Sequence, residues 1–284
     1  MNSTEPSVDL ATRRRKIHAM GGEAKLATRR ASGVMNARER IAALCDAGSF
    51  SEIGEFARSA RPEDLDRTPA DGIVTGFGRV DGRNIAVASF DLTTLGASST
   101  VTNIRKLNFL KLSASKAGIA CAFLIESAGA RMPDIQGAVG MGRVGQLNAT
   151  NRDRDVPWVC AVLGPCYGMG TWYAVQSDFA VMRRDATFSV ASPKVTSVAL
   201  GQVVTPEELG GSDLHADTTG QIDLVTDTDA QAIAASQLRS LDGRIGALLA
   251  RNDVKLDDYS RAHLAEMQAR LRKVLEASLQ LPRP

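Results

Sequence analysis

From Asp71 onward, short apolar runs alternate with amphipathic segments, and this alternation constrains the fold of the 284-residue chain most strongly. The runs over 73–80 and 84–90 are joined by Asp81-Gly82, a pair typical of tight β-hairpins. Strands that alternate with helices indicate crossover connections and largely parallel pairing. The sequence therefore predicts an α/β fold, with further strands over 119–125, 158–163, 179–182 and 187–190 and helices over 101–115 and 141–151.

Helical patterns flank this region on both sides. Residues 12–47 form a helical pattern that stops before a glycine and carries an apolar stripe with Ile41 and Leu44. Leucines recur at helical spacing over 230–250 and 257–279. We therefore expect three parts: an N-terminal helical arm (1–60), a core (61–250) and a C-terminal amphipathic helix (251–284) whose apolar stripe faces a partner.

Charge and composition argue against several classes of protein. A net charge of +2 is too small to indicate a nucleic-acid or acidic-membrane partner. No apolar run is long enough to span a bilayer. The four cysteines form no CxxC pair, so neither a disulfide framework nor a zinc site is expected. These features predict a cytoplasmic protein with no metal, nucleic acid or membrane partner.

The basic residues are unevenly distributed. A cluster of basic residues lies near the N-terminus. It is compatible with a phosphate- or RNA-binding patch, but such a cluster more often forms a solvated helix face. They crowd the first thirty positions as Arg13, Arg14, Arg15, Lys16, Lys25, Arg29 and Arg30.

Three loops rich in small residues follow strand-like runs, over 95–100, 126–131 and 164–170. Where a strand leads into a helix, unpaired backbone N–H groups and the helix dipole create positive potential. Glycine lets a ligand approach that backbone closely. The loops are therefore suited to an anion, either a phosphate or a transient enolate oxygen. Tight turns in any α/β sheet have the same composition, so this alternative stays open.

The three loops lack the motifs of several other chemistries. None of the three loops matches G-x-G-x-x-G or G-x-x-x-x-G-K-[ST], and neither G-x-S-x-G nor H-E-x-x-H is found. The three histidines, His18, His215 and His263, are scattered along the chain. An oxyanion hole made of backbone N–H groups fits this inventory, because it stabilises developing charge without a titrating side chain.

Five stretches between residues 21 and 232 carry a more specific signal. In order, they are NARERI with DAGSF (36–41, 46–50), DGIVTGFGRVDGR (71–83), SAGAR (127–131), GPCYGM with SDF (164–169, 177–179), and TPEELGG with His215 (205–211, 215). Together they resemble the carboxyltransferase family of biotin-dependent acyl-CoA carboxylases, such as the propionyl-CoA carboxylase β subunit. The resemblance covers only the N-terminal half of such a subunit.

This resemblance implies a fold, a reaction and partners. The fold would be a crotonase-like ββα spiral with flanking N- and C-terminal helices. The reaction would move a carboxyl group from carboxybiotin to the α-carbon of an acyl-CoA, with the coenzyme A thioester as substrate and biotin carried on a separate protein. The partners would be a homologous C-half carboxyltransferase subunit and a biotin carboxyl carrier protein, in a hetero-oligomer.

The resemblance also assigns residues. The oxyanion donors would be the backbone amides of Gly168 and Met169, with Gly129 and Ala130 lining the second loop. The wall of the coenzyme A channel would come from Gly96, Ala97 and Ser98. Lys106 would meet a coenzyme A phosphate, although a solvated helix lysine is nearly as good an interpretation.

Two alternatives stay open, one because a related type of enzyme also divides this fold over two chains, the other because of departures from the family pattern. Met169 and Ala128 stand where the family has glycines, and Ser192-Pro193 replaces Gly-Pro. One alternative is the β-type subunit of a biotin-independent enzyme like malonate decarboxylase, acting on an acyl-carrier thioester. The other is a non-catalytic coenzyme A-binding or assembly subunit.

Overall fold

The computed structural model describes residues 6–138, 140, 142 and 156–237. All but residue 142 of the predicted helix over 141–151, most of the one over 230–250 and the C-terminal helix over 251–284 lie outside these residues. Within the described part, no helix combines the length and apolar character needed to cross a membrane.

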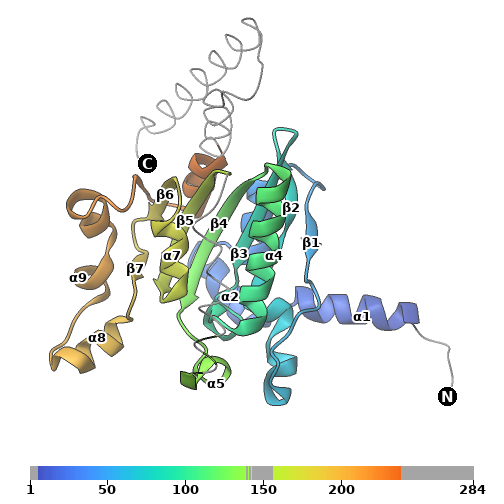
Figure 1. The fold of residues 1–284 in the computed structure, drawn as a ribbon, viewed down its shortest axis with the longest axis horizontal. Helices are drawn as coiled ribbons and strands as arrows, with labels where there is room; N and C mark the ends of the chain where they lie inside the picture. The colour runs from blue at the N-terminus through green and yellow to red at the C-terminus, as the bar shows by residue number, and fades with distance from the viewer. Residues whose placement is uncertain (1–5, 139, 141, 143–155, 238–284) are drawn as a thin grey trace, which may run out of the picture.

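A single mixed sheet organises the described residues (Figure 1). Its strands follow the order β1-β2-β3-β4-β5-β6-β8, and β7 pairs with the end of β5. The first three strands pair antiparallel, whereas all later pairings are parallel. The predicted α/β fold is confirmed. The strands are β1 (Ser51–Ile53), β2 (Ile73–Val80), β3 (Arg83–Phe90), β4 (Ala120–Ala128), β5 (Trp158–Tyr167), β6 (Phe179–Arg183), β7 (Thr187–Ser189) and β8 (Leu224–Thr226).

The hairpin predicted from Asp81-Gly82 is confirmed as β2 and β3, which pair over their whole length. Both turn residues have positive φ, 48° at Asp81 and 74° at Gly82, as a two-residue hairpin turn of the type I′ class requires. The carboxylate of Asp46 accepts hydrogen bonds from both turn amides, at 3.0 and 2.8 Å. Asp46 therefore attaches the segment before β1 to this turn.

Helices cover both faces of the sheet. On one face, α4 and α7 pack their apolar residues against the β4 and β5 side chains, with Phe123, Trp158 and Tyr173 in mutual ring contact. On the other face lie α2, α3 and the helical residues 229–237. The helices are α1 (Pro6–His18), α2 (Glu23–Ala31), α3 (Ala37–Leu44), α4 (Val101–Ala117), α5 (Met132–Ile135), α7 (Met169–Val175), α8 (Pro193–Leu200) and α9 (Pro206–Gly210).

The helical pattern predicted over 12–47 is divided into three helices. Gly21 lies between α1 and α2, where a Cβ atom would come within 2.1 Å of Thr93 O. Asn36 then starts α3 with a capping box that includes Glu39. The predicted apolar stripe is buried, because Leu44 is fully inaccessible. Helices α2 and α3 therefore share a core with the sheet.

A buried ionic cluster joins α3 to the sheet and to residues 229–237. Arg40 is fully inaccessible, and it donates to Glu126 at 2.7 Å and to Asp229 at 2.9 Å. Arg29 adds a second bond to Glu126, and Arg183 one to Asp229. Burial by itself lowers the pKa of Arg40, but the two carboxylates more than offset this and raise it. The guanidinium therefore stays charged in the interior.

Replacing Arg40 with alanine leaves Glu126 and Asp229 short of a buried cation. We expect the Arg40→Ala variant to lose about 3–5 kcal/mol of free energy of unfolding, measured by urea denaturation. Arg15→Ala, at an exposed position on α1, should change this free energy by at most about 0.5 kcal/mol. Equal effects of the two substitutions would contradict a structural role for the cluster.

Candidate active site

Two of the predicted loops are joined at the carboxyl end of β4. The first loop contains residues 95–97, in a short 3-10 turn after β3, and the second follows β4. A parallel bridge links them, because Ser99 N donates to Gly129 O (2.7 Å) and Arg131 N donates to Ser99 O (3.0 Å). Ligands of open parallel sheets bind beyond these carboxyl ends. The structure thus brings Ser98 close to Gly129 and Ala130.

The second and third loops meet at two glycines. A Cβ atom on Gly168 would lie 3.1 Å from Gly129 Cα and 3.7 Å from Ala130 N. Both glycines have positive φ, 65° at Gly168 and 94° at Gly129, a conformation in which other residues are strained. The bridge to Ser99 uses Gly129 O and Arg131 N, so the Ala130 N–H points to the opposite side.

The third loop differs from the prediction. The strand predicted to end at residue 163 continues as β5 to Tyr167, because residues 165–167 pair with β7. The Gly168 amide donates to Val190 O at 2.9 Å. Gly168 therefore lets the third loop approach Gly129 closely, while its N–H binds Val190, the residue that follows β7. Met169 is the first residue of α7.

A buried ion pair fixes the second loop. Arg131 donates to Asp71 at 2.6 Å and to the Ser98 hydroxyl at 3.0 Å. Asp71 is fully inaccessible and also accepts a hydrogen bond from the Thr100 hydroxyl. Asn103, in α4, donates to both the Asp71 and Ser98 carbonyls. The start of β2, the first loop and the second loop are therefore locked together.

Two segments of this network have left-handed backbone. Ala70, Asp71 and Gly72 have φ values of 50°, 46° and 73°. Residues 95–97 have φ values of 43°, 68° and 47°. Such conformations cost about 1–3 kcal/mol per non-glycine residue and persist where the surroundings impose them. A Cβ on Gly96 would lie 2.7 Å from the Ala128 Cβ. The alanine that stands at position 128 in place of the family's glycine is therefore accommodated because its neighbour, Gly96, has no side chain.

Lys106 occupies a different environment from the predicted one. Its ammonium group is buried and donates to Ala70 O at 2.7 Å and to Ile73 O at 2.5 Å. Burial lowers the pKa of Lys106 to about 8, and the charges of Glu52 and Asp71 oppose this shift. Lys106 therefore stabilises the left-handed turn that carries Asp71, and this geometry lends no support to a phosphate contact.

An apolar cavity of about 490 Å³ lies beside α7 and β7. Trp172, Val190 and His215 are among its lining residues. His215 Nε2 contacts Phe188 O at 2.7 Å, and Nδ1 contacts the Thr219 hydroxyl at 3.1 Å. A carbonyl oxygen only accepts, so Nε2 carries the proton. With both ring nitrogens engaged, His215 is a structural residue.

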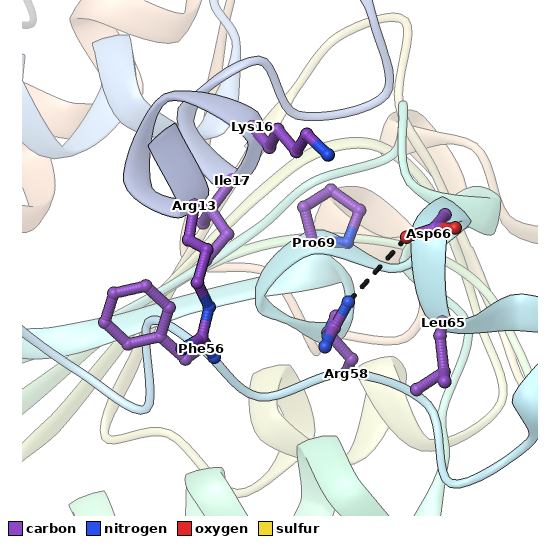
Figure 2. A pocket seen from close by; sticks show the side chains of 8 residues that line it. All are labelled: Arg13, Lys16, Ile17, Phe56, Arg58, Leu65, Asp66 and Pro69. Atoms are coloured by element: carbon purple, nitrogen blue, oxygen red, sulfur yellow. Dashed lines mark ion pairs between the residues drawn. The ribbon is translucent and has the colours of Figure 1, made fainter. Parts of the chain in front are cut away.

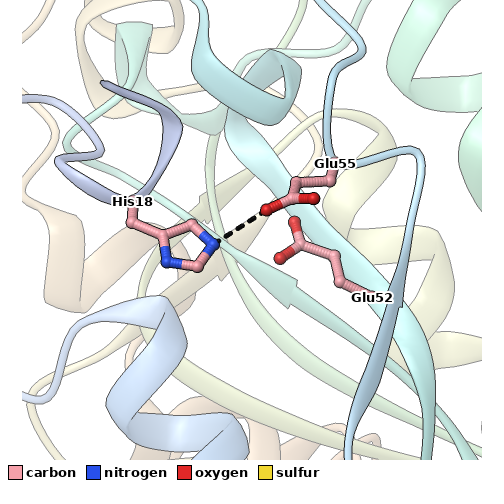
Figure 3. A group of neighbouring side chains, drawn as sticks. All are labelled: His18, Glu52 and Glu55. Atoms are coloured by element: carbon pink, nitrogen blue, oxygen red, sulfur yellow. Dashed lines mark hydrogen bonds and ion pairs between the residues drawn. The ribbon is translucent and has the colours of Figure 1, made fainter. Parts of the chain in front are cut away.

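One group of possible metal ligands occurs among the described residues. The ligand atoms of His18, Glu52 and Glu55 lie within 4.8 Å of one another (Figure 3). Glu55 accepts a bidentate interaction from Arg14, and Glu52 one from Arg38. Both carboxylates are thus neutralised by guanidinium groups, and the arrangement is an ion-pair network.

Asp71 and Arg131 are the residues that the sequence-based assignment missed. Each stands at the edge of a motif that was recognised, Asp71 at the start of the hairpin motif and Arg131 at the end of SAGAR. A charged residue of each sign beside glycine turns was the available signal. Their pairing could not be derived from the sequence, because 60 residues separate them.

A carboxyl transferase domain matches residues 28–242 of the chain. The chain belongs to the carboxyl transferase family. It is 33% identical over 230 residues to the propionyl-CoA carboxylase carboxyltransferase subunit of Haloferax mediterranei, which covers 79% of this chain and 44% of that protein. It is 34% identical over 236 residues to the methylmalonyl-CoA carboxyltransferase 12S subunit of Propionibacterium freudenreichii subsp. shermanii, covering 81% and 45%. The chain thus spans about half the length of these relatives.

Solved structures of this family share the fold. A transcarboxylase 12S structure with hydrolysed methylmalonyl-coenzyme A bound aligns with a TM-score of 0.74 and 31% identity, over 84% of this chain and 48% of that one. The crotonase-like fold is therefore confirmed. A chain of a Pseudomonas malonate decarboxylase hetero-tetramer has a TM-score of 0.62 at 21% identity, over 88% and 92%, and shows the fold alone.

The buried state of Lys106 predicts a specific pH dependence. Because its pKa falls from 10.5 to about 8 on folding, the unfolded chain binds more protons between these pH values, and stability rises with pH. The free energy of unfolding of the wild type, minus that of Lys106→Met, should rise between pH 8 and 10 by at most about 1.4 kcal/mol per unit. Other titrating groups, including the buried cysteines, cancel in this difference.

Denaturant titrations of both proteins at several pH values measure this difference. A difference that stays flat from pH 7.5 to 10 would show that the Lys106 ammonium is solvated. It would also restore the predicted contact with a phosphate.

Proposed function

We propose that the chain is the N-half subunit of a split acyl-CoA carboxyltransferase, which moves a carboxyl group from carboxybiotin to the α-carbon of an acyl-CoA. One observation carries this proposal: the Gly129 and Gly168 turns touch at the carboxyl ends of β4 and β5, in a chain of the carboxyl transferase family. This contact brings the backbone of residues 129–130 close to the residues that start α7.

The proposed chemistry depends on charge that develops on the thioester oxygen. Transfer of the α-proton of the acyl-CoA to the ureido group of biotin, which would become basic as the carboxyl group leaves it, would create an enolate, whose oxygen needs hydrogen-bond donors. We assign this task to the amides of Met169, at the start of α7, and Ala130, which points to the side of Gly168. The Gly168 amide is replaced in this role because it already donates to Val190.

The coenzyme A thioester is proposed to pass along the first loop. Gly96, Ala97 and Ser98 remain the candidates for its wall, since Ser98 and its neighbour Ser99 bond to the second loop. Lys106 does not line this wall; it stabilises the turn at Asp71 through hydrogen bonds to backbone carbonyls. Of the residues assigned from the resemblance, it is therefore the one we place outside the channel.

We infer that the remaining half of the site comes from a homologous C-half subunit. The chain spans about half of its relatives, and a set of large apolar side chains is exposed around α7, β7 and α8. Monomeric proteins seldom expose large contiguous apolar surface. The set is Trp172, Val175, Val190, Val195, Val198, Leu200 and Val203, with exposures of 46–89%.

A biotin carboxyl carrier protein would complete the proposed hetero-oligomer by delivering biotin to the shared site. We place the complex in the cytoplasm, because the four cysteines are buried and unpaired, as is usual in a reducing compartment. The low net charge supports a reaction without nucleic acid or membrane surfaces.

Reconstitution tests the function directly. The chain, co-purified with a homologous C-half subunit from the same genome, should carboxylate at least one of acetyl-, propionyl- or a longer acyl-CoA when carboxybiotin is supplied. The chain without that subunit should be inactive. A complex that carboxylates none of these acyl-CoAs but releases CO₂ from a malonyl thioester would show that the enzyme is a decarboxylase and would contradict the proposal.

Met169 offers a sharper test of the oxyanion donors. Proline is tolerated at the first position of a helix, so Met169→Pro removes one amide donor while α7 can still form. We expect kcat of the reconstituted complex to fall by about 10²–10³-fold. Met169→Ala keeps the amide and should lose far less. Similar kcat values for the two variants would rule out this amide as a donor.

A further inference from the structure

A small basic pocket lies between α1 and the segment that follows β1 (Figure 2). Its volume is about 190 Å³. Figure 2 shows Arg13 and Lys16 of α1 together with Arg58 around Pro69. The remaining walls are Ile17, Phe56, Leu65 and Asp66.

The charges of this pocket favour an anion. Three cationic side chains face a single carboxylate, Asp66, whose nearest approach to Arg58 is 3.8 Å and whose side chain is 98% exposed. The neighbouring Arg14 is different, because Glu55 binds it through two oxygens at 2.9 and 3.0 Å. Of the cations of α1, Arg14 is therefore neutralised by Glu55, Arg15 is exposed outside the pocket, and Arg13 and Lys16 line the pocket, with Asp9 3.8 Å from Arg13.

The walls of the pocket suit an aromatic group beside the anion. The Arg13 guanidinium lies 5.2 Å from the centre of the Phe56 ring, an arrangement that keeps both groups in place by cation–π attraction. Ile17 and Pro69 supply apolar surface. A phosphate joined to a flat heterocycle satisfies both the cations and these walls.

The position of the pocket connects it to the proposed active site. Pro69 is two residues before Asp71, whose carboxylate binds Arg131, the residue after Ala130. The volume is below the roughly 300–1,000 Å³ of pockets that enclose a drug-sized ligand. The pocket can therefore hold only one end of a long ligand, and Asp71 and Arg131 connect its Pro69 wall to the loop of Ala130 through bonded contacts.

We propose that Arg13, Lys16 and Arg58 bind the 3′-phosphorylated adenosine end of the acyl-CoA substrate. This inference rests on the proposed function for the identity of the ligand. The basic cluster near the N-terminus is then a phosphate site in part, and its members outside the pocket are solvated or paired. Electrostatic attraction of this kind weakens as ionic strength rises.

Titration calorimetry on the co-purified complex tests the site with three probes: CoA, dephospho-CoA and ATP. Dephospho-CoA lacks only the 3′-phosphate, so the wild type should bind it more weakly than CoA by about tenfold or more, the equivalent of one charge-assisted contact. Arg13→Gln, Lys16→Gln and Arg58→Gln should each weaken CoA binding by about tenfold and reduce this preference. Arg15→Gln, on the same helix but outside the pocket, should retain it.

Equal affinity for CoA and dephospho-CoA in the wild type would overturn the proposal, as would a preference that survives all three substitutions. Binding of ATP through these residues without binding of CoA would also overturn it. The readout requires no turnover. A complex that discriminates the 3′-phosphate but carboxylates nothing would thus refute the proposed reaction and leave the phosphate site intact.

Discussion

The ion pair between Asp71 and Arg131 is the interaction on which the arrangement of the candidate site depends. Asp71 is fully inaccessible and Arg131 is 6% exposed, so each charge depends on the other and on its hydrogen bonds for compensation. The pair joins the start of β2 to the residue after Ala130. Ser98 and Thr100, in the first loop, complete its hydrogen bonding. A single buried contact thereby positions two of the three loops.

The cost of this arrangement is left-handed backbone at Ala70 and Asp71, which other contacts must offset. Lys106 serves this purpose, because its ammonium bonds the carbonyls on either side of the turn. The cluster centred on Arg40 performs a separate task on the other face of the sheet. It attaches α3 to β4 through Glu126, and Gly164 leaves room for that carboxylate, since a Cβ there would lie 2.3 Å from Glu126 Oε1.

Local patterns predicted much of the fold correctly. The hairpin at Asp81-Gly82, the helix that became α4 and the strands that became β4 and β6 all follow from short-range periodicity and turn chemistry. The end of β5 did not, because Gly164-Pro165 looks like a turn and becomes strand only through pairing with β7. The division of residues 12–47 into three helices depends in the same way on the distant Thr93.

The candidate site shows the same division. The sequence and the family resemblance located the glycines, and the structure brings Gly96, Gly129 and Gly168 to one edge of the sheet. Which amides are engaged, and what Lys106 contacts, depend on partners far away in sequence, such as Val190 and Ala70. Local reasoning could not supply these contacts, and because of them we propose Ala130 and Met169 as donors in place of the predicted Gly168 and Met169.

Hydrogen exchange of individual amides tests most directly whether this edge of the sheet binds the thioester oxygen. The measurement uses the reconstituted complex with and without a non-reactive acyl-CoA analogue. We predict that the analogue slows exchange at Ala130 and Met169 more than at Gly168, whose amide is bonded to Val190 in either state. Tight binding of the analogue with unchanged exchange at both Ala130 and Met169 would contradict a site built from these two loops.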